Sequence, residues 1–358
     1  MIDDCIKVTS YFGERERIGG RFFSDVLLDT FEAYDVSSSI LLRASAGFGL
    51  RHRLRTDETL TMSEDPSVVA VASDTRARME PLLGRIAGLQ PRGMLTVERA
   101  RVVRGDVESG PIPAALGEAA KLTIYVGRRE RVYRVPAYVA VCDLLHRRGI
   151  AGASVLVGVD GTFQGSRERA RFWDRNIDVP SMVLAVGDRA RIERVLPELG
   201  ALLRRPMITV ERVQVCKTTG QLLARPQRLP DVDEQGLGVW QKLTIYTSES
   251  RLHEGEPVHR AIVRRLRATS ARGATALRGV WGFHGDDEPR GDRLFQLGRG
   301  VPVVTVLVDT PSRIAASFDV IDALTTEHGL VTSEIVPAMQ YFGPGTEGGG
   351  LRLAGLHD

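Results

Sequence analysis

The sequence predicts an α+β fold in which one βαββαβ unit is repeated three times along a single chain. Three near-identical strand segments, KVTSYFG, KLTIYVG and KLTIYTS, begin at Lys7, Lys121 and Lys242. Counting from the tyrosine of each segment, a glycine follows 36 residues later and an aspartate 63 residues later in every copy. Because these markers keep the same register, we predict a triple internal repeat with a period of 114 to 121 residues.

The middle copy shows the elements of the unit most clearly. Residues 122–126 alternate apolar and polar side chains as a strand does, and residues 135–148 carry apolar side chains at helical spacing. The segments GASVLVGV and SMVLAV predict the second and third strands. Asp188 stands where the N-cap of the second helix belongs, and MITVERVQV closes the unit as its last strand.

The repeat divides the chain into three domains, two linkers and a tail. We predict domains over residues 1–105, 120–216 and 240–340. The segments 106–119 and 217–239 contain glycine, proline and many polar residues and are expected to be linkers. Residues 341–358 are rich in glycine and are expected to be a flexible tail.

Both faces of the predicted sheets are apolar, although two helices can cover only one of them. The third strands, SVVAVA, SMVLAV and VPVVTVLV, are apolar at odd and even positions alike. We therefore expect the three domains to bury their second faces against one another around a pseudo-threefold axis, as a closed trimer within one chain. The alternative is three separate domains, each covering its own sheet.

Composition and charge exclude several classes of protein. With 48 basic and 45 acidic residues the net charge is only +3, which gives no reason to expect nucleic acid binding. The cysteines Cys5, Cys142 and Cys216 are widely spaced, which argues against disulfides and structural zinc and favours a cytoplasmic setting. No apolar run is long enough to insert into a membrane, and the N-terminal segment lacks the apolar stretch of a signal peptide.

The order of elements, the KLTIYVG strand, the glycine-rich turn after the second strand and the last strands, VTVE and VTSE, resemble the PII-like family called domain of unknown function 190. The third copy, with RGVWGFHGDDEPRGDRLFQLGRGVPVVTVLVDT, is the most similar, and the likeness covers residues 6–103, 121–216 and 242–338. The resemblance implies ferredoxin-like domains and signal transduction, in which adenine nucleotides or other small effectors bind between subunits. It also implies a partner that the protein regulates, such as a membrane transporter or a fluoride channel.

Topology brings the candidate ligand-binding residues to one end of each domain. The first and second strands of such a unit run parallel, so the loops after the first and second strands lie together. These loops combine glycines, helix N-termini and arginines, which together favour an anion such as a phosphate. The candidates are Gly47, Phe48, Gly49, Arg51, Arg53, Arg55, Gly127, Arg128, Gly161, Phe163, Arg167, Arg169, Arg171, Gly282, Phe283, Gly285, Arg290 and Arg293.

Two groups of these candidates have competing interpretations. The alternating triplets 51/53/55 and 167/169/171 would point three arginines the same way on an extended segment, although such residues also occur in solvated loops. The phenylalanine after each turn glycine could stack on a base or anchor its loop to its own domain. Trp173 and Trp281 occur in single copies and are expected to be packing or interface residues.

Catalysis and metal binding are not expected. No nucleotide-binding motif, serine elbow or metalloprotease motif is present, and the seven histidines lack metal-ligand spacing. His253, His259 and His284 could approach one another at the loop end of the third copy and hold a metal, although exposed or hydrogen-bonded histidines are the simpler interpretation. Glu98, Glu211 and Glu334 recur on the last strands, where salt bridges at an interface are more common than general bases. The alternatives to an effector-binding regulator are a scaffold without ligand and a CutA-like metal-responsive trimer.

Overall fold

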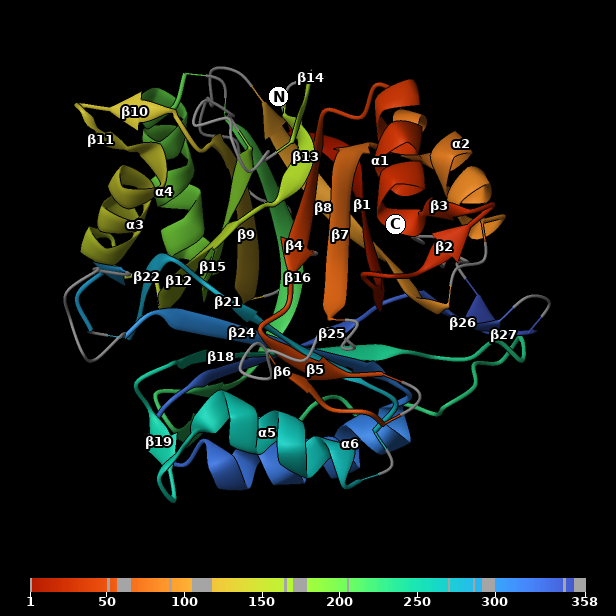
Figure 1. Cartoon of the computed structure of the whole chain (residues 1–358). Coiled ribbons are helices and arrows are strands. Elements are labelled where there is room, and N and C mark those ends of the chain that lie inside the picture. The colour runs from red at the N-terminus through yellow and green to blue at the C-terminus, as the bar shows by residue number, and fades with distance from the viewer. Residues whose placement is uncertain are drawn as a thin grey trace.

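The computed structural model describes residues 2–49, 52–56, 66–89, 92–104, 118–163, 166–169, 179–204, 206–269, 271–285, 287–291, 300–343 and 346–350. Within them the fold is mixed α+β, with mainly antiparallel sheet and three repeated domains. The helices lie on the outside in three pairs and the strands fill the interior (Figure 1).

Each repeat contains the predicted βαββαβ order. The first repeat comprises β1 (Ile2–Gly13), α1 (Phe23–Ala33), β4 (Ser38–Arg43), β7 (Ser67–Thr75), α2 (Arg76–Ala87) and β8 (Gly93–Arg104). The second comprises β9 (Ala119–Gly127), α3 (Ala137–Arg147), β12 (Gly152–Val157), β15 (Pro180–Asp188), α4 (Arg189–Leu202) and β16 (Met207–Thr218). The third comprises β18 (Gln241–Ser248), α5 (Val258–Arg267), β21 (Ala274–Arg278), β24 (Pro302–Asp309), α6 (Pro311–Leu324) and β25 (Leu330–Ile335).

The strand order confirms the predicted topology within each repeat. In the first repeat β1 pairs antiparallel with β7 and β8, and β4 pairs antiparallel with β7. The first and second strands therefore run parallel, with the third strand between them. Asp188 is the N-cap of α4 as predicted, because its side chain accepts a hydrogen bond from the amide of Arg191 at 2.8 Å.

Short hairpins add further strands to each repeat. Between the first strand and first helix lie β2 (Arg17–Ile18) with β3 (Arg21–Phe22), β10 (Arg131–Val132) with β11 (Val135–Pro136), and β19 (Leu252–His253) with β20 (Glu256–Pro257). After the second strand lie β5 (Ala46–Phe48) with β6 (Arg55–Thr56), β13 (Asp160–Phe163) with β14 (Ser166–Arg169), and β22 (Trp281–His284) with β23 (Arg290–Gly291).

The second set of hairpins joins the repeats in a cyclic order. Strand β5 of the first repeat pairs with β21 of the third, β13 of the second pairs with β4 of the first, and β22 of the third pairs with β12 of the second. The last strands are linked as well, since β8 pairs with β16 and β16 pairs with β25. Every repeat is thus hydrogen-bonded to both of the others.

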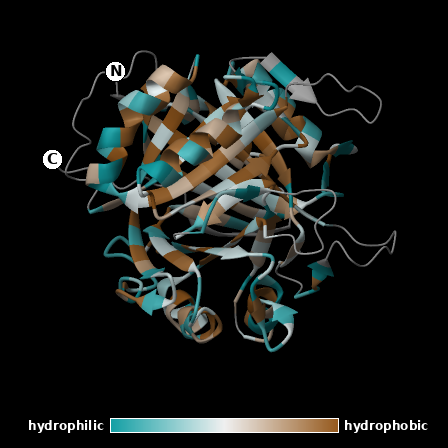
Figure 2. Cartoon of the chain, turned by 90° about the vertical axis from the view of Figure 1, so that its left-hand side faces the viewer, coloured by the Kyte–Doolittle hydropathy of each residue, from teal (hydrophilic) through white to brown (hydrophobic). Residues whose placement is uncertain are grey.

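The second faces of the three sheets are buried together, as predicted from their apolar strands. One core cluster takes side chains from all three repeats, among them Val71, Leu184 and Val304 from the third strands. Each repeat also has a separate core between its sheet and its two helices. Hydrophobic residues accordingly concentrate on the inner strands, and hydrophilic ones on the outer loops (Figure 2).

The predicted linker and tail differ from the structure. Residues 217–239 are not a plain linker, because β16 runs on to Thr218, β17 (Gln221–Leu222) pairs back onto it, and Asp231 accepts hydrogen bonds from Ser312 in the first turn of α6. Part of the predicted flexible tail is strand, since β26 (Ala338–Gly343) pairs with β27 (Thr346–Gly350) and with β8. Of the predicted linker at 106–119, residues 106–117 lie outside the described residues.

Candidate functional site

Three lysines and three glutamates meet in the interior between the repeats. Each lysine begins the repeated segment of the first strand, and each glutamate lies directly opposite on the last strand of the same repeat, as in Lys7 with Glu98. All six side chains are at most 7% exposed: Lys7, Lys121, Lys242, Glu98, Glu211 and Glu334. This pairing explains why the repeated segment begins with lysine, a residue that sequence reasoning did not single out.

The six charges form a closed ring in which lysines and glutamates alternate; we call it the ion ring. Within repeats, the nitrogen–oxygen distances are 2.8 Å for Lys7–Glu98, 2.7 Å for Lys121–Glu211 and 3.1 Å for Lys242–Glu334. Between repeats, Lys121 contacts Glu334 at 2.7 Å, Lys242 contacts Glu98 at 2.8 Å, and Lys7 pairs with Glu211. The expectation that these glutamates are interfacial salt-bridge partners is therefore confirmed.

The electrostatics of the ion ring are those of compensated buried charges. The surrounding lysines hold the pKa of Glu98 well below its usual value, in spite of the burial that would raise it. The pKa of Glu211 is lowered for the same reason. The three carboxylates lie close enough to share a cation, with one oxygen from each within 4.8 Å of the others. Because three ammonium groups already supply the positive charge there, this arrangement disfavours a metal ion.

The hairpin glycines belong to the junctions between repeats. A Cβ atom on Gly47 would lie 2.8 Å from the carbonyl oxygen of Ala274 in the third repeat. Equivalent atoms on Gly161 and Gly282 would approach Ser39 and Ala153 of the neighbouring repeats closer still. These glycines recur because a side chain would prevent the backbones from pairing, and that requirement accounts for them without a ligand.

A cavity of about 350 Å³ lies between the first and third repeats. We call it the arginine cleft, because the described residues that line it include five arginines and one acidic residue, Glu16. The arginines are Arg15, Arg53, Arg55, Arg92 and Arg272. Its apolar lining includes Phe12, Met94 and Val306. The cleft thus combines dense positive charge with a hydrophobic surface.

The arginine cleft brings together four of the residues predicted from sequence: Phe48, Gly49, Arg53 and Arg55. Sequence reasoning missed Arg92, which directly precedes β8, and Arg272, which lies in the segment before β21. No local motif marks them, and Arg272 reaches the cleft through the pairing of β5 with β21. Arg272 is held by the indole ring of Trp240, 5.1 Å away, and by Asp309 at 3.7 Å.

A second cavity of about 260 Å³ lies between the second and third repeats. It has a different chemistry, with Arg251, three histidines and three acids: His253, His284, His328, Glu254, Asp287 and Glu327. Gly285 lines this cavity too, whereas Gly282, Phe283 and Arg290 line a smaller neighbouring one. Burial lowers the pKa of His284 to about 4, so its imidazole is neutral at physiological pH.

The third hairpin junction, between the first and second repeats, is filled by its own ion pairs. Arg167 contacts Asp160 at 3.2 Å, pairs with Asp29 and lies 3.9 Å from Asp25. It is therefore already neutralised and does not face an open anion site, contrary to the predicted row of arginines. Gly127 pairs with Pro180 in the sheet and Arg128 is exposed, and neither lines a cavity described above.

Two of the three turn phenylalanines anchor their hairpins, but to the neighbouring repeat rather than to their own domain. Phe48 packs in the core of the third repeat, and Phe283 packs in the core of the second, edge-on to His146 at 5.0 Å. Phe163 is partly buried against the shared central cluster, and Trp281 packs beside the second core. Arg51, Arg171, Arg293 and Trp173 lie outside the described residues, as does the side chain of Arg169.

The described residues contain neither a histidine metal cluster nor a membrane-spanning helix. His253, His259 and His284 do not form a cluster whose ligand atoms could share an ion. His259 is buried, which lowers its pKa to about 4. None of the described helices is long and apolar enough to cross a membrane.

Comparison with known proteins identifies the repeats. The model of the DUF190 family, described as "Uncharacterized ACR", matches residues 5–102, 119–215 and 240–338. The chain belongs to this family. A stretch of 94 residues is similar to a UPF0166 protein of Aquifex aeolicus (strain VF5), with 33% identity; it makes up 26% of this chain and 88% of that protein. No solved structure matches the chain.

Proposed function

We propose that this chain is a PII-like regulatory protein that binds an anionic effector in the arginine cleft. In this proposal the three DUF190 repeats are ferredoxin-like domains closed as an intramolecular trimer. The cyclic hairpin pairing and the ion ring support that arrangement, because each links every repeat to both others. The protein acts by binding and has no catalytic step.

The observation that carries the proposal is the convergence of five arginines on one cavity between repeats. Guanidinium groups bind phosphate and carboxylate through paired hydrogen bonds, and a cleft rich in them concentrates negative ligands. Gly13, Gly49, Gly93 and Gly273 also line the cavity, so backbone can approach the ligand closely there. Two of the arginines, Arg53 and Arg55, belong to the hairpin that joins the repeats.

The size and lining of the cleft favour a nucleotide over a simple inorganic anion. A volume of about 350 Å³ lies within the range of small-molecule sites. The arginines would hold the phosphates, and the apolar lining from Phe12, Met94 and Val306 would cover the base. An adenine mononucleotide or dinucleotide fits this division of the cavity.

The regulatory step would follow from the position of the cleft. Arg53 lies in the segment between the hairpin strands β5, which ends at Phe48, and β6, which begins at Arg55. A ligand that binds Arg53 would restrict this segment and change the surface that the protein offers to a partner. We propose a membrane transporter or fluoride channel as that partner.

Calorimetry and thermal unfolding with AMP, ADP, ATP and inorganic phosphate test the proposal. A ligand at 100 times its dissociation constant adds about 2.7 kcal/mol to the free energy of unfolding. We expect one nucleotide to bind. The Arg53→Ala variant should bind it about tenfold more weakly, because it lacks one charge-assisted hydrogen bond.

Arg194→Ala is the matched control, because Arg194 is an exposed arginine on α4 outside the cleft. It should leave nucleotide affinity unchanged. Absence of binding by every nucleotide in the panel would refute the effector site and favour the scaffold alternative. An equal loss in both variants would show that binding depends only on total charge.

A further inference from the structure

The β10–β11 hairpin of the second repeat has an unusual tip. Its two turn residues, Tyr133 and Arg134, have φ angles of +47° and +73°. Residues with a Cβ rarely adopt this left-handed conformation, and turns of this kind usually contain asparagine, aspartate or glycine. Backbone strain of this sort is retained where the side chains serve a purpose.

The equivalent hairpins of the other repeats show what the turn itself requires. The first repeat has Gly19 and Gly20 at these positions, with φ angles of +57° and +81°. The third repeat has Glu254 and Gly255, with φ angles of +52° and +82°. The turn geometry is thus common to all three, and only the second repeat occupies both positions with large side chains.

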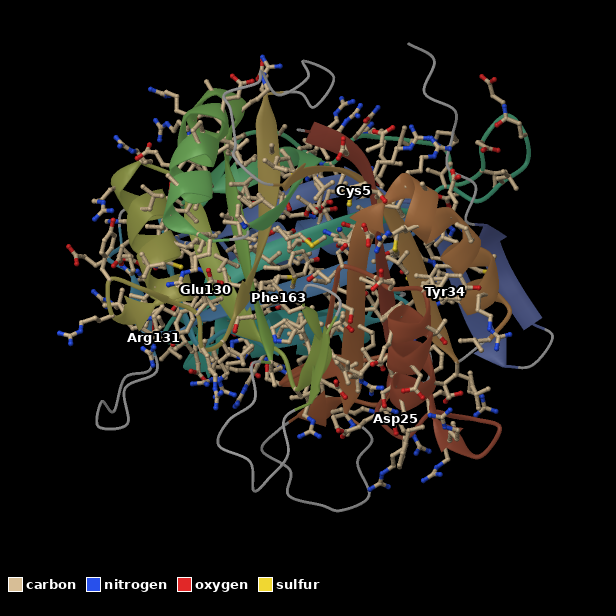
Figure 3. All side chains as sticks on the ribbon, turned by 90° about the horizontal axis from the view of Figure 1, so that it is seen from above. Cys5, Asp25, Tyr34, Glu130, Arg131 and Phe163 are labelled. Carbon is tan, nitrogen blue, oxygen red and sulfur yellow. The ribbon has the colours of Figure 1, made fainter. Side chains whose placement is uncertain are left out.

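The tip is also exposed and basic. Tyr133 is 92% exposed and Val135 is 41% exposed. Four exposed arginines lie within seven residues, Arg128, Arg129, Arg131 and Arg134, against one glutamate. The corresponding third-repeat segment, 249–257, has one arginine against three glutamates. Seen from above, Arg131 lies at the periphery of the molecule, far from Cys5 in the interior (Figure 3).

We propose that this hairpin docks the protein onto the surface of an anionic lipid bilayer. Clusters of basic residues bind the negative headgroups, and tyrosine prefers the boundary between headgroups and acyl chains. A hairpin tip offers little area, whereas a stable protein–protein interface needs roughly 800 Å² from each partner. A lipid surface does not have this requirement, because its headgroups rearrange around a small projecting tip.

The proposal does not rest on the effector site. The arginine cleft lies between the first and third repeats, and the hairpin belongs to the second. Membrane docking would bring the protein to the membrane that contains a transporter partner. The docking proposal is tested by lipid binding alone.

Vesicle flotation with the full chain tests the proposal. The probes are vesicles of phosphatidylcholine alone and of phosphatidylcholine mixed with phosphatidylglycerol, at low and physiological salt. We expect binding only to the anionic vesicles, weakened by salt. Arg134→Gly should reduce vesicle binding roughly fivefold. Adding Tyr133→Asn, which places a residue suited to the turn at that position, should reduce vesicle binding further.

Glu254→Gly is the matched control, since it changes the same turn position in the third repeat and should leave vesicle binding unchanged. Absence of binding by the unaltered protein at low salt would overturn the proposal. Equal binding by the Tyr133→Asn/Arg134→Gly variant would also overturn it, because the attraction would then lie elsewhere on the surface. Nucleotide binding measured on the same variants should be unaffected.

Discussion

The lysines and glutamates of the ion ring are the residues on which the arrangement of the repeats depends most. Removing one member leaves an uncompensated charge in the interior, which costs about 3–5 kcal/mol. We expect Lys121→Met to lower the free energy of unfolding by this amount, measured by urea denaturation. Lys121 contacts glutamates of both its own and the third repeat, at 2.7 Å each.

The control for this variant is Arg148→Met. Arg148 forms an ion pair with Glu198 at 2.6 Å, but both side chains are more than a third exposed. Surface pairs of this kind contribute less than about 1 kcal/mol. Comparable losses for the two variants would contradict the importance assigned to burial.

The ion ring also makes stability depend on pH. The pKa values of Glu98 and Glu211 are lowered in the folded protein from an ordinary value of 4.5. Their contribution is therefore fully present above that value and is lost as the pH falls through the folded pKa values. We expect the urea midpoint to fall steadily below about pH 5. A midpoint that stays constant or rises in acid would refute this linkage.

At the β10–β11 turn, the strained residues lower stability while they expose their side chains. Replacing Tyr133 or Arg134 by glycine should raise the free energy of unfolding by about 0.5–1 kcal/mol, because glycine relieves the left-handed backbone. Thermal unfolding of the single variants measures this gain. A loss of stability would show that the two side chains support the fold, which their exposure argues against.

At the scale of elements, the hairpins that cross between repeats decide how the domains assemble. Gly282→Ala would place a methyl group against the carbonyl oxygen of Ala153 and force β22 away from β12. We expect a loss of about 2–3 kcal/mol, since the strand must move or lose its hydrogen bonds. Urea denaturation and amide exchange of β12 would measure it.

Gly84→Ala is the control for this substitution. Gly84 lies inside α2 with open space around its Cβ position. Alanine there should stabilise the helix by up to about 1 kcal/mol. If Gly282→Ala were equally harmless, the hairpin pairing would not be the reason that the glycine recurs.

At the scale of the whole molecule, the cyclic links make the repeats interdependent. The central cluster takes side chains from all three, and the ion ring crosses every junction. We expect one cooperative thermal transition in calorimetry, with equal calorimetric and van't Hoff enthalpies. Three separable transitions would show instead that each domain unfolds by itself.

Local sequence patterns determined the parts of this protein that depend on neighbouring residues. The repeat, the order of strands and helices and the Asp188 cap could be predicted, because periodicity and capping act over a few residues. The apolar third strands also indicated that the second sheet faces are buried. Phe48, Arg53 and Arg55 were correctly expected to lie at a common end of their domain. The sequence did not indicate which cleft they would line.

Only the tertiary structure decided which residues meet between repeats. Lys7 and Glu211, or Arg53 and Arg272, are more than 200 positions apart in the chain, and no local signal relates them. The tertiary structure also showed that Arg167 is neutralised by neighbouring carboxylates, which makes the three junctions between repeats unequal. The physical reason is that the hairpins pair with neighbouring repeats and thereby set the long-range contacts. Those contacts decide whether an arginine faces an open cleft or an internal partner.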